Sequence, residues 1–365
     1  MCILRSLFVF GMLFFLGCES DDEAIDGVTD GNPSQTDFSD LLQNQIDHII
    51  IPAMDGYQAE MSALKLNTDR FVNQPDSQKL ATIQQRFQSA YLSYQAAAVH
   101  NYFATQNQAL VSTTNLFPVD TASLEDAIRN QNYNFSTSAQ QRANGFPALD
   151  YLLYGSANVL GDFAGDSLRL NFLDQLVNFM HDKSIALSNA WIGSLRDNYV
   201  SNGGTQLGSS ISVQLNESLI YYEVHIRENK VGIPIGRLGP NDSPITPDPT
   251  KIEGYYLSRS LGNEAFTLSL LRKSIEEMER IYSGEGSSAA DNQGYDDLLL
   301  ARGQGAVDND IQAQFDEIYQ EIDNRTQISG DDELYLRVQR LITLYKSDLF
   351  PLLNVQDADG ANDGD

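Results

Sequence analysis

Hydrophobic side chains recur at helical spacing along most of the chain, and strand-like alternation of apolar and polar residues is nearly absent. Six apolar stripes follow this spacing, each with a polar opposite face. They begin at Leu42, Leu80, Leu168, Ile211, Ile311 and Leu334. An amphipathic helix buries its apolar face against a neighbour, and without strands that neighbour is another helix. The pattern therefore predicts an all-α protein, in which Pro52 kinks the first helix or begins a new one.

Two segments interrupt the helical pattern and suggest how the chain is divided. Residues 155–165 form a glycine-rich connection, and residues 231–250 contain five prolines, which exclude a continuous helix interior. We expect two helical bundles packed side by side, the first over residues 38–160 and the second over residues 161–353. The long proline-rich loop lies in the second bundle, where it is expected to be ordered.

The N-terminal residues resemble the signal peptide of a bacterial lipoprotein. Arg5 precedes an apolar run at residues 7–16, which is too short to span a bilayer, and Leu16-Gly17-Cys18 looks like a lipobox. Residues 1–18 are therefore expected to be the signal peptide and lipobox, with a lipid on the Cys18 thiol. That lipid would anchor the protein in the outer membrane, on the periplasmic or the outer face. The alternative is an ordinary cytosolic start with a chance apolar run.

Acidic segments flank the predicted bundles. Residues 19–37 are predicted to be a flexible tether and residues 354–365 a disordered tail. Within the tether, Ser20-Asp21-Asp22-Glu23 resembles the export signals of surface lipoproteins in Bacteroidetes, although an acidic tether alone is an equal alternative. The net charge of −27 argues against nucleic acid as a partner and permits cationic partners. Because Cys2 lies in the removed segment, the remaining chain has no possible disulfide.

Five short segments resemble, in family order, the imelysin family of bacterial envelope proteins. They are residues 44–52, 115–120, 145–154, 230–236 and 253–260. The resemblance implies an all-helical envelope protein of two bundles, with the proposed site between them. Some members of the family are described as insulin-cleaving metallopeptidases, and others accompany iron-uptake systems.

The signature segment keeps the family's frame but changes its proposed ligands. Where the family has Gly-x-His-x-x-Glu, this chain has Gly145, then Pro147 at the histidine position and Asp150 at the glutamate position. Proline has no donor atom for a metal, so the imidazole–carboxylate pair that suits a transition metal cannot form. A helix that starts at Pro147 would place Asp150 in its first turn. Asp150 is then either a capping or dipole-stabilising group, or a surviving metal ligand.

Further candidates lie in the second half of the chain. His225 and Glu228 form a literal His-x-x-Glu and would share a helix face, so they are candidate metal ligands with Asp150. Their alternative role is a solvated helix end. The candidates for lining the site between the bundles are Gly145, Pro147, Asp150, Arg237, Glu253, Tyr256 and Arg259. Backbone geometry, loop hydrogen bonds and ion pairs are the alternative roles of these residues.

One histidine outside these motifs, His100, ends the second stripe. It is interpreted either as a satisfied core histidine or as a residue that approaches the cleft.

The chain has no His-Glu-x-x-His, Gly-x-Ser-x-Gly or P-loop motif. We therefore favour a non-enzymatic lipoprotein that takes part in acquiring iron or another divalent metal. Its expected partners are the membrane, through the Cys18 lipid, and a metal ion, a metal complex or an envelope protein. The alternatives are an imelysin-type metallopeptidase and a structural, partner-binding surface lipoprotein with a degenerate site.

Overall fold

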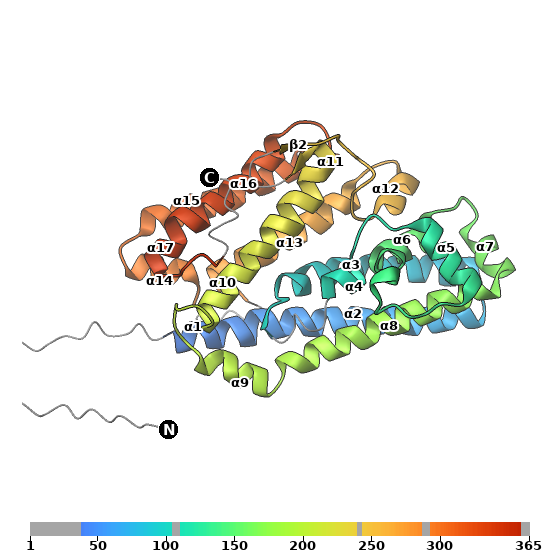
Figure 1. Ribbon diagram of the computed structural model, residues 1–365, viewed down its shortest axis with the longest axis horizontal. Coiled ribbons are helices and arrows are strands. Elements are labelled where there is room, and N and C mark those ends of the chain that lie inside the picture. Colours follow the sequence, from blue (N-terminus) through green and yellow to red (C-terminus); the bar gives the residue numbers. More distant parts are fainter. Residues whose placement is uncertain (1–37, 104–109, 239–242, 287–292, 359–365) are drawn as a thin grey trace, which may run out of the picture. The chain divides into compact units, whose positions relative to one another are not determined.

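The protein is all-α, as the apolar pattern predicts. The computed structural model describes residues 38–103, 110–238, 243–286 and 293–358 (Figure 1). The predicted signal peptide and tether, and residues 359–365 of the tail, lie outside the described residues. Among the described residues, no helix combines the length and the apolar character needed to cross a membrane.

The helical elements follow one another in chain order with a single short hairpin between them. The α-helices of the first half are α1 (Ser39–Asn44), α2 (Ile51–Asn73), α3 (Ser77–Val99), α4 (Leu110–Thr114), α5 (Thr121–Asn130), α6 (Gly145–Tyr154), α7 (Val159–Gly165) and α8 (Ser167–Trp191). Those of the second half are α9 (Ser194–Ser201), α10 (Ser210–Tyr221), α11 (Ile233–Ile235), α12 (Tyr255–Leu261), α13 (Ala265–Ser283), α14 (Tyr295–Ala301), α15 (Gly305–Asp323), α16 (Glu333–Leu344) and α17 (Phe350–Leu353). A 3-10 helix, η3, spans Ser138–Ala143, and strands β1 (Arg237–Leu238) and β2 (Ser243–Pro244) pair antiparallel.

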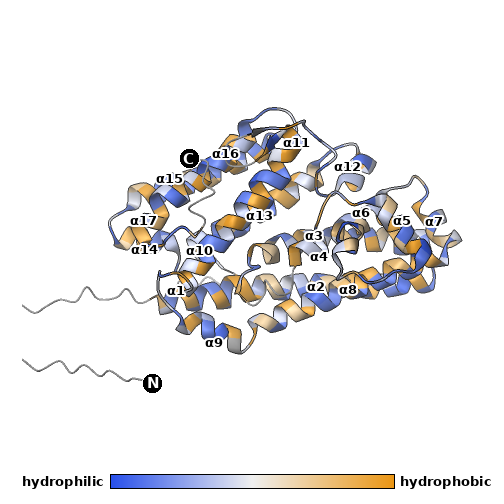
Figure 2. Ribbon diagram, viewed as in Figure 1, coloured by the Kyte–Doolittle hydropathy of each residue, from blue (hydrophilic) through white to orange (hydrophobic). Residues whose placement is uncertain are grey.

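The apolar stripes become the buried core. Along α2, Met54, Tyr57 and Met61 are almost fully buried, and Phe315 on α15 and Val338 on α16 are buried as well. Figure 2 shows the result, in which helices such as α13 carry apolar and hydrophilic residues on different sides. Since fully burying one large apolar side chain contributes about 1.5–3 kcal/mol, these stripes supply the main drive for helix packing.

The predicted division of the chain at residue 160 falls between helices that pack against each other. Helix α8 begins beyond that position, yet it packs along α2, which also packs against α3 (Figure 1). The glycine-rich connection is partly helical, because the Asn158 side chain caps α7 and the Phe163 ring packs edge-on against Phe71. These contacts turn the chain back toward α2. All the described residues belong to one compact unit.

Three π-helical segments each end two residues before a proline. They are η1 (Gln45–Ile50) before Pro52, η4 (Tyr222–Gly232) before Pro234 and η5 (Tyr345–Leu349) before Pro351. A proline lacks the N–H group of an α-helical hydrogen bond, and its ring crowds the carbonyl one turn earlier. The wider π turn accommodates both effects, so the helix continues through each proline. Pro52 accordingly lies in the first turn of α2.

The proline-rich segment is less loop-like than its composition predicts. Its first residues complete η4 and form α11, which ends at Gly236 with a φ of 88°. The hairpin β1–β2 follows, and the chain then runs to α12. The predicted loop over residues 231–250 therefore begins as helix, because η4 and α11 tolerate Pro234 near the start of a new α turn.

Candidate functional site

The signature segment forms α6, and its first residue has to be glycine. Gly145 has a φ of 77°, a conformation that residues with a side chain rarely adopt. A Cβ atom added there would lie 2.1 Å from the carbonyl oxygen of Thr114. The helix begins at Gly145, with Asn144 as its N-cap residue, and not at Pro147. The predicted place of Asp150 in the first turn is therefore wrong, because the glycine conformation lets the helix start earlier.

Asp150 caps a different helix from its own. Its Oδ2 accepts a hydrogen bond from the backbone N–H of Tyr256 at 2.7 Å, and its Oδ1 accepts one from Leu257 at 3.0 Å. These donors belong to the first turn of α12, where N–H groups have no partner within the helix. The side chain is 2% exposed. Burial raises the pKa of Asp150 to about 7, although the two N–H groups act in the opposite direction.

A cavity of about 300 Å³ lies beside this contact, and we call it the signature cavity. It brings together three of the predicted site residues, Pro147, Asp150 and Tyr256. The rest of its wall is mainly apolar or aromatic and comes from two segments. The segment before the signature contributes Phe117, Pro118 and Val119, and the segment before and within α12 contributes Thr250, Ile252, Gly254 and Tyr255. A mostly apolar hollow with one buried carboxyl group at its wall is typical of a small-molecule site.

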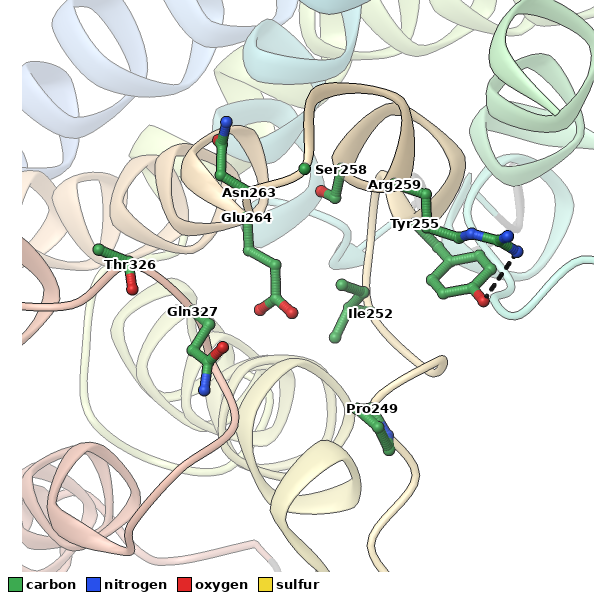
Figure 3. Close-up of a pocket in the computed structure, with 10 residues that line it drawn as sticks. Pro249, Ile252, Tyr255, Ser258, Arg259, Asn263, Glu264, Thr326 and Gln327 are labelled. Atoms are coloured by element: carbon green, nitrogen blue, oxygen red, sulfur yellow. Dashed lines mark hydrogen bonds between the residues drawn. The ribbon is translucent and has the colours of Figure 1, made fainter. Parts of the chain in front are cut away.

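Arg259 lies in a neighbouring hollow of about 280 Å³, shown in Figure 3. The two cavities share Ile252 and Tyr255. The guanidinium carbon of Arg259 lies 5.5 Å from the centre of the Tyr255 ring, and its Nη1 donates to the Tyr255 hydroxyl at 3.3 Å. This cation–π contact places a positive charge next to the signature cavity but outside its wall.

Glu253 is buried behind the signature cavity in a polar network and does not line the cavity. Its carboxylate forms an ion pair with Lys230 and accepts hydrogen bonds from the side-chain amides of Gln95 and Asn115. Lys230 also donates to Gln95 Oε1 at 2.7 Å. Burial lowers the pKa of Lys230, and the charge of Glu253 opposes that shift. Because the partners come from α3, η4 and the residues after α4, the network fixes the segment that leads into α12.

The remaining predicted residues lie elsewhere. Glu228 forms an ion pair with Arg227 at 3.0 Å, and Arg237 on β1 forms one with Asp332. The His225 ring lies 4.9 Å from the Tyr221 ring in a tilted arrangement, and His225 lines another cavity. Within the described parts of the chain, no three His, Cys, Asp or Glu side chains gather closely enough to hold a metal ion. Asp150, His225 and Glu228 are therefore not brought together as one ligand group.

His100 is a satisfied core histidine. Its Nε2 lies 2.7 Å from Glu277 Oε1, its Nδ1 lies 3.0 Å from the Tyr102 hydroxyl, and all three side chains are buried. Burial alone would raise the pKa of Glu277, but the hydrogen bond and charge of His100, followed by the charge of Arg280, outweigh it and lower that pKa.

Several residues that shape the site were not predicted. Tyr255 lines both cavities, and Lys230 and Gln95 hold Glu253 in place. Lys230 could have been noticed, because it directly precedes the apolar run of residues 231–235 in a segment that resembles the family. Gln95 gives no comparable signal, since a glutamine near the end of a helix stripe is ordinary.

The fold and the site together define an all-α protein with a cavity between its signature helix and α12. The imelysin family matches the chain over residues 50–345, so the chain belongs to the imelysin family. No curated protein matches it in sequence.

Two crystal structures share this fold. One is described as an iron-regulated protein A precursor from Parabacteroides distasonis, with 14% identity and a TM-score of 0.69 over 89% of this chain and 96% of that one. The other is an imelysin-like protein from Psychrobacter arcticum, with 13% identity and a TM-score of 0.66 over 88% of this chain and 96% of that one.

Proposed function

We propose that this protein is a non-enzymatic, lipid-anchored component of the bacterial cell envelope that binds iron, or another metal, in the signature cavity. The main support for the proposal is that Pro147, Asp150 and Tyr256 all line that cavity. The family membership and the name of the Parabacteroides distasonis structure support the link to iron.

The chemistry of the wall favours a metal complex as the bound species. Both carboxylate oxygens of Asp150 are engaged by backbone N–H groups, and Pro147 replaces the imidazole of the family motif. The free surface of the wall is mainly aromatic and apolar, with the Arg259 charge next to it. Such a wall suits the organic part of an anionic iron complex better than it suits a hydrated ion.

The test is a calorimetric titration of the chain from residue 19 onward with ferrous, zinc and copper ions and with ferric citrate. We expect ferric citrate to bind at one site per chain. Replacing Tyr256 with phenylalanine removes one hydroxyl at the cavity wall, and we expect it to weaken binding about tenfold, the effect of about 1.4 kcal/mol.

The matched control is His225→Ala, which alters a different cavity and should leave the affinity unchanged. Loss of binding in His225→Ala alone would move the site to that cavity. Failure of every probe to bind would contradict the proposal. Zinc-dependent hydrolysis of a peptide that Asp150→Asn abolishes would contradict the non-enzymatic part of it.

Lipid attachment has its own test. We expect cells that express the full chain and are fed alkyne-palmitate to label the protein, and we expect Cys18→Ser to abolish the labelling, because Cys18 supplies the thiol of the predicted lipobox. Cys2→Ser is the control, since that residue would be removed with the signal peptide. Equal labelling of the Cys18→Ser variant would refute this anchor.

A further inference from the structure

A third cavity, of about 370 Å³, shares no lining residue with the signature cavity. Residues from the end of α3 and from α4 form one side of it, and α10 and η4 form the other. We call it the Glu217 cavity. Its aliphatic wall includes Val99, Val111, Leu116 and Ile220.

Two oxygen-bearing side chains in this cavity have no donor. The Oδ1 atom of Asn101 is buried and has no hydrogen-bond partner. No hydrogen bond or ion pair joins Glu217, on α10, to any residue in the described ranges. A buried acceptor without a donor costs about 1–3 kcal/mol, so native proteins usually satisfy such atoms with water or a ligand. The buried Asn101 oxygen therefore calls for a donor from outside the chain, and the Glu217 carboxylate, which is partly exposed, can accept from the same donor.

The other charged and titratable groups near the cavity do not oppose a cation. Burial, followed by the charge of Lys230, lowers the pKa of His225 to about 4, so its imidazole is neutral at physiological pH. The charge of Lys230 is itself paired with Glu253. Burial raises the pKa of Tyr221, which stays a neutral phenol. Glu217 is thus the charged side chain of the lining, and the net charge of −27 adds a long-range attraction for cations.

We propose that the Glu217 cavity binds a small organic cation, a primary alkylammonium group with a short aliphatic chain. The ammonium donates to the Glu217 carboxylate and to Asn101 Oδ1, and the chain packs against the aliphatic wall. An ammonium group carries three donors and no acceptor, which matches the two acceptors, Glu217 and Asn101 Oδ1, that this cavity offers. This site is independent of metal binding in the signature cavity.

The experiment is a calorimetric titration of the full-length protein, held in detergent, with n-butylammonium chloride. We expect saturable binding at one site, and much weaker binding of n-butanol, which has the same chain without the charge. Glu217→Gln keeps the shape of the side chain and removes its charge, and we expect it to weaken binding at least about tenfold. Because Glu217 makes no contact that stabilises the fold, circular dichroism should show an unchanged melting curve.

The matched control is Glu228→Gln, which removes the same charge from η4 outside the cavity wall and should leave the affinity unchanged. Absence of saturable binding would overturn the proposal. Equal affinity for butanol would overturn it too, as would a Glu217→Gln variant that binds like the unaltered protein or a Glu228→Gln variant that loses binding equally.

Discussion

Replacing Asp150 with alanine is expected to lower the free energy of unfolding by about 2–4 kcal/mol at pH 6. The change removes the acceptor of two backbone N–H groups at the start of α12, and each buried donor left without a partner costs about 1–3 kcal/mol. Urea unfolding followed by circular dichroism measures the effect. Asp316→Ala removes an exposed aspartate from α15 and should stay within about 0.5 kcal/mol of the unaltered protein.

The contribution of Asp150 to the free energy of unfolding is also expected to depend on pH. Burial raises the native pKa of Asp150 to about 7, above its ordinary value of 3.8, so between these values the native state holds a proton that the unfolded chain releases. The contribution of Asp150 to stability is therefore full below about pH 4 and is lost as the pH rises through 7. An asparagine at this position cannot titrate.

Comparison with Asp150→Asn isolates this titration, because the other acidic groups are common to both proteins. The free energy of unfolding of the unaltered protein, minus that of Asp150→Asn, should fall by about 3–4 kcal/mol between pH 4 and pH 8. A difference that rises with pH would show that Asp150 is ionised throughout the native range. That result would contradict burial as the dominant influence on its pKa.

Replacing Lys230 with methionine is expected to lower the free energy of unfolding by about 3–5 kcal/mol. The substitution keeps the length of the side chain but leaves the Glu253 carboxylate, 2% exposed, without its cation. Burying an unpaired charge costs far more than the net worth of an intact pair. Ligand binding in the signature cavity should weaken as well, since Glu253 directly precedes the cavity residues Gly254, Tyr255 and Tyr256.

A double substitution separates the loss of the pair from the loss of packing. Lys230→Met combined with Glu253→Gln removes both charges, and we expect it to recover at least about 2 kcal/mol of the stability lost in Lys230→Met. Lys251→Met is the control, because Lys251 pairs with Asp248 at the surface and should contribute about 0–1 kcal/mol. A cost below about 1 kcal/mol for Lys230→Met, or no recovery in the double variant, would contradict this view of the network.

The sequence predicts the helical class and part of the site because both depend on local signals. The apolar stripes have the helical period, and the segments around Pro147 and Tyr256 resemble the imelysin family in the right order. Three of the residues predicted to line the site, Pro147, Asp150 and Tyr256, lie at one cavity. For Gly145, backbone geometry was the alternative to lining the site, and its positive φ agrees with that alternative.

The remainder of the site depends on contacts between distant parts of the chain. Asp150 caps a helix that begins about a hundred residues later, and no local pattern reveals such a partner. The same holds for Glu253, whose network includes Gln95 from α3. Contacts across the expected boundary near residue 160 are equally distant in sequence, because the Phe163 ring packs on Phe71 and α8 packs along α2.

The most direct test of the proposed function is to locate iron in crystals of the protein grown with saturating ferric citrate. Diffraction data collected on either side of the iron absorption edge give the iron position without reference to any assumed site. The proposal predicts an anomalous peak inside the signature cavity, next to Asp150 and Tyr256. A peak at another place on the protein, or no peak at saturating ferric citrate, would contradict it.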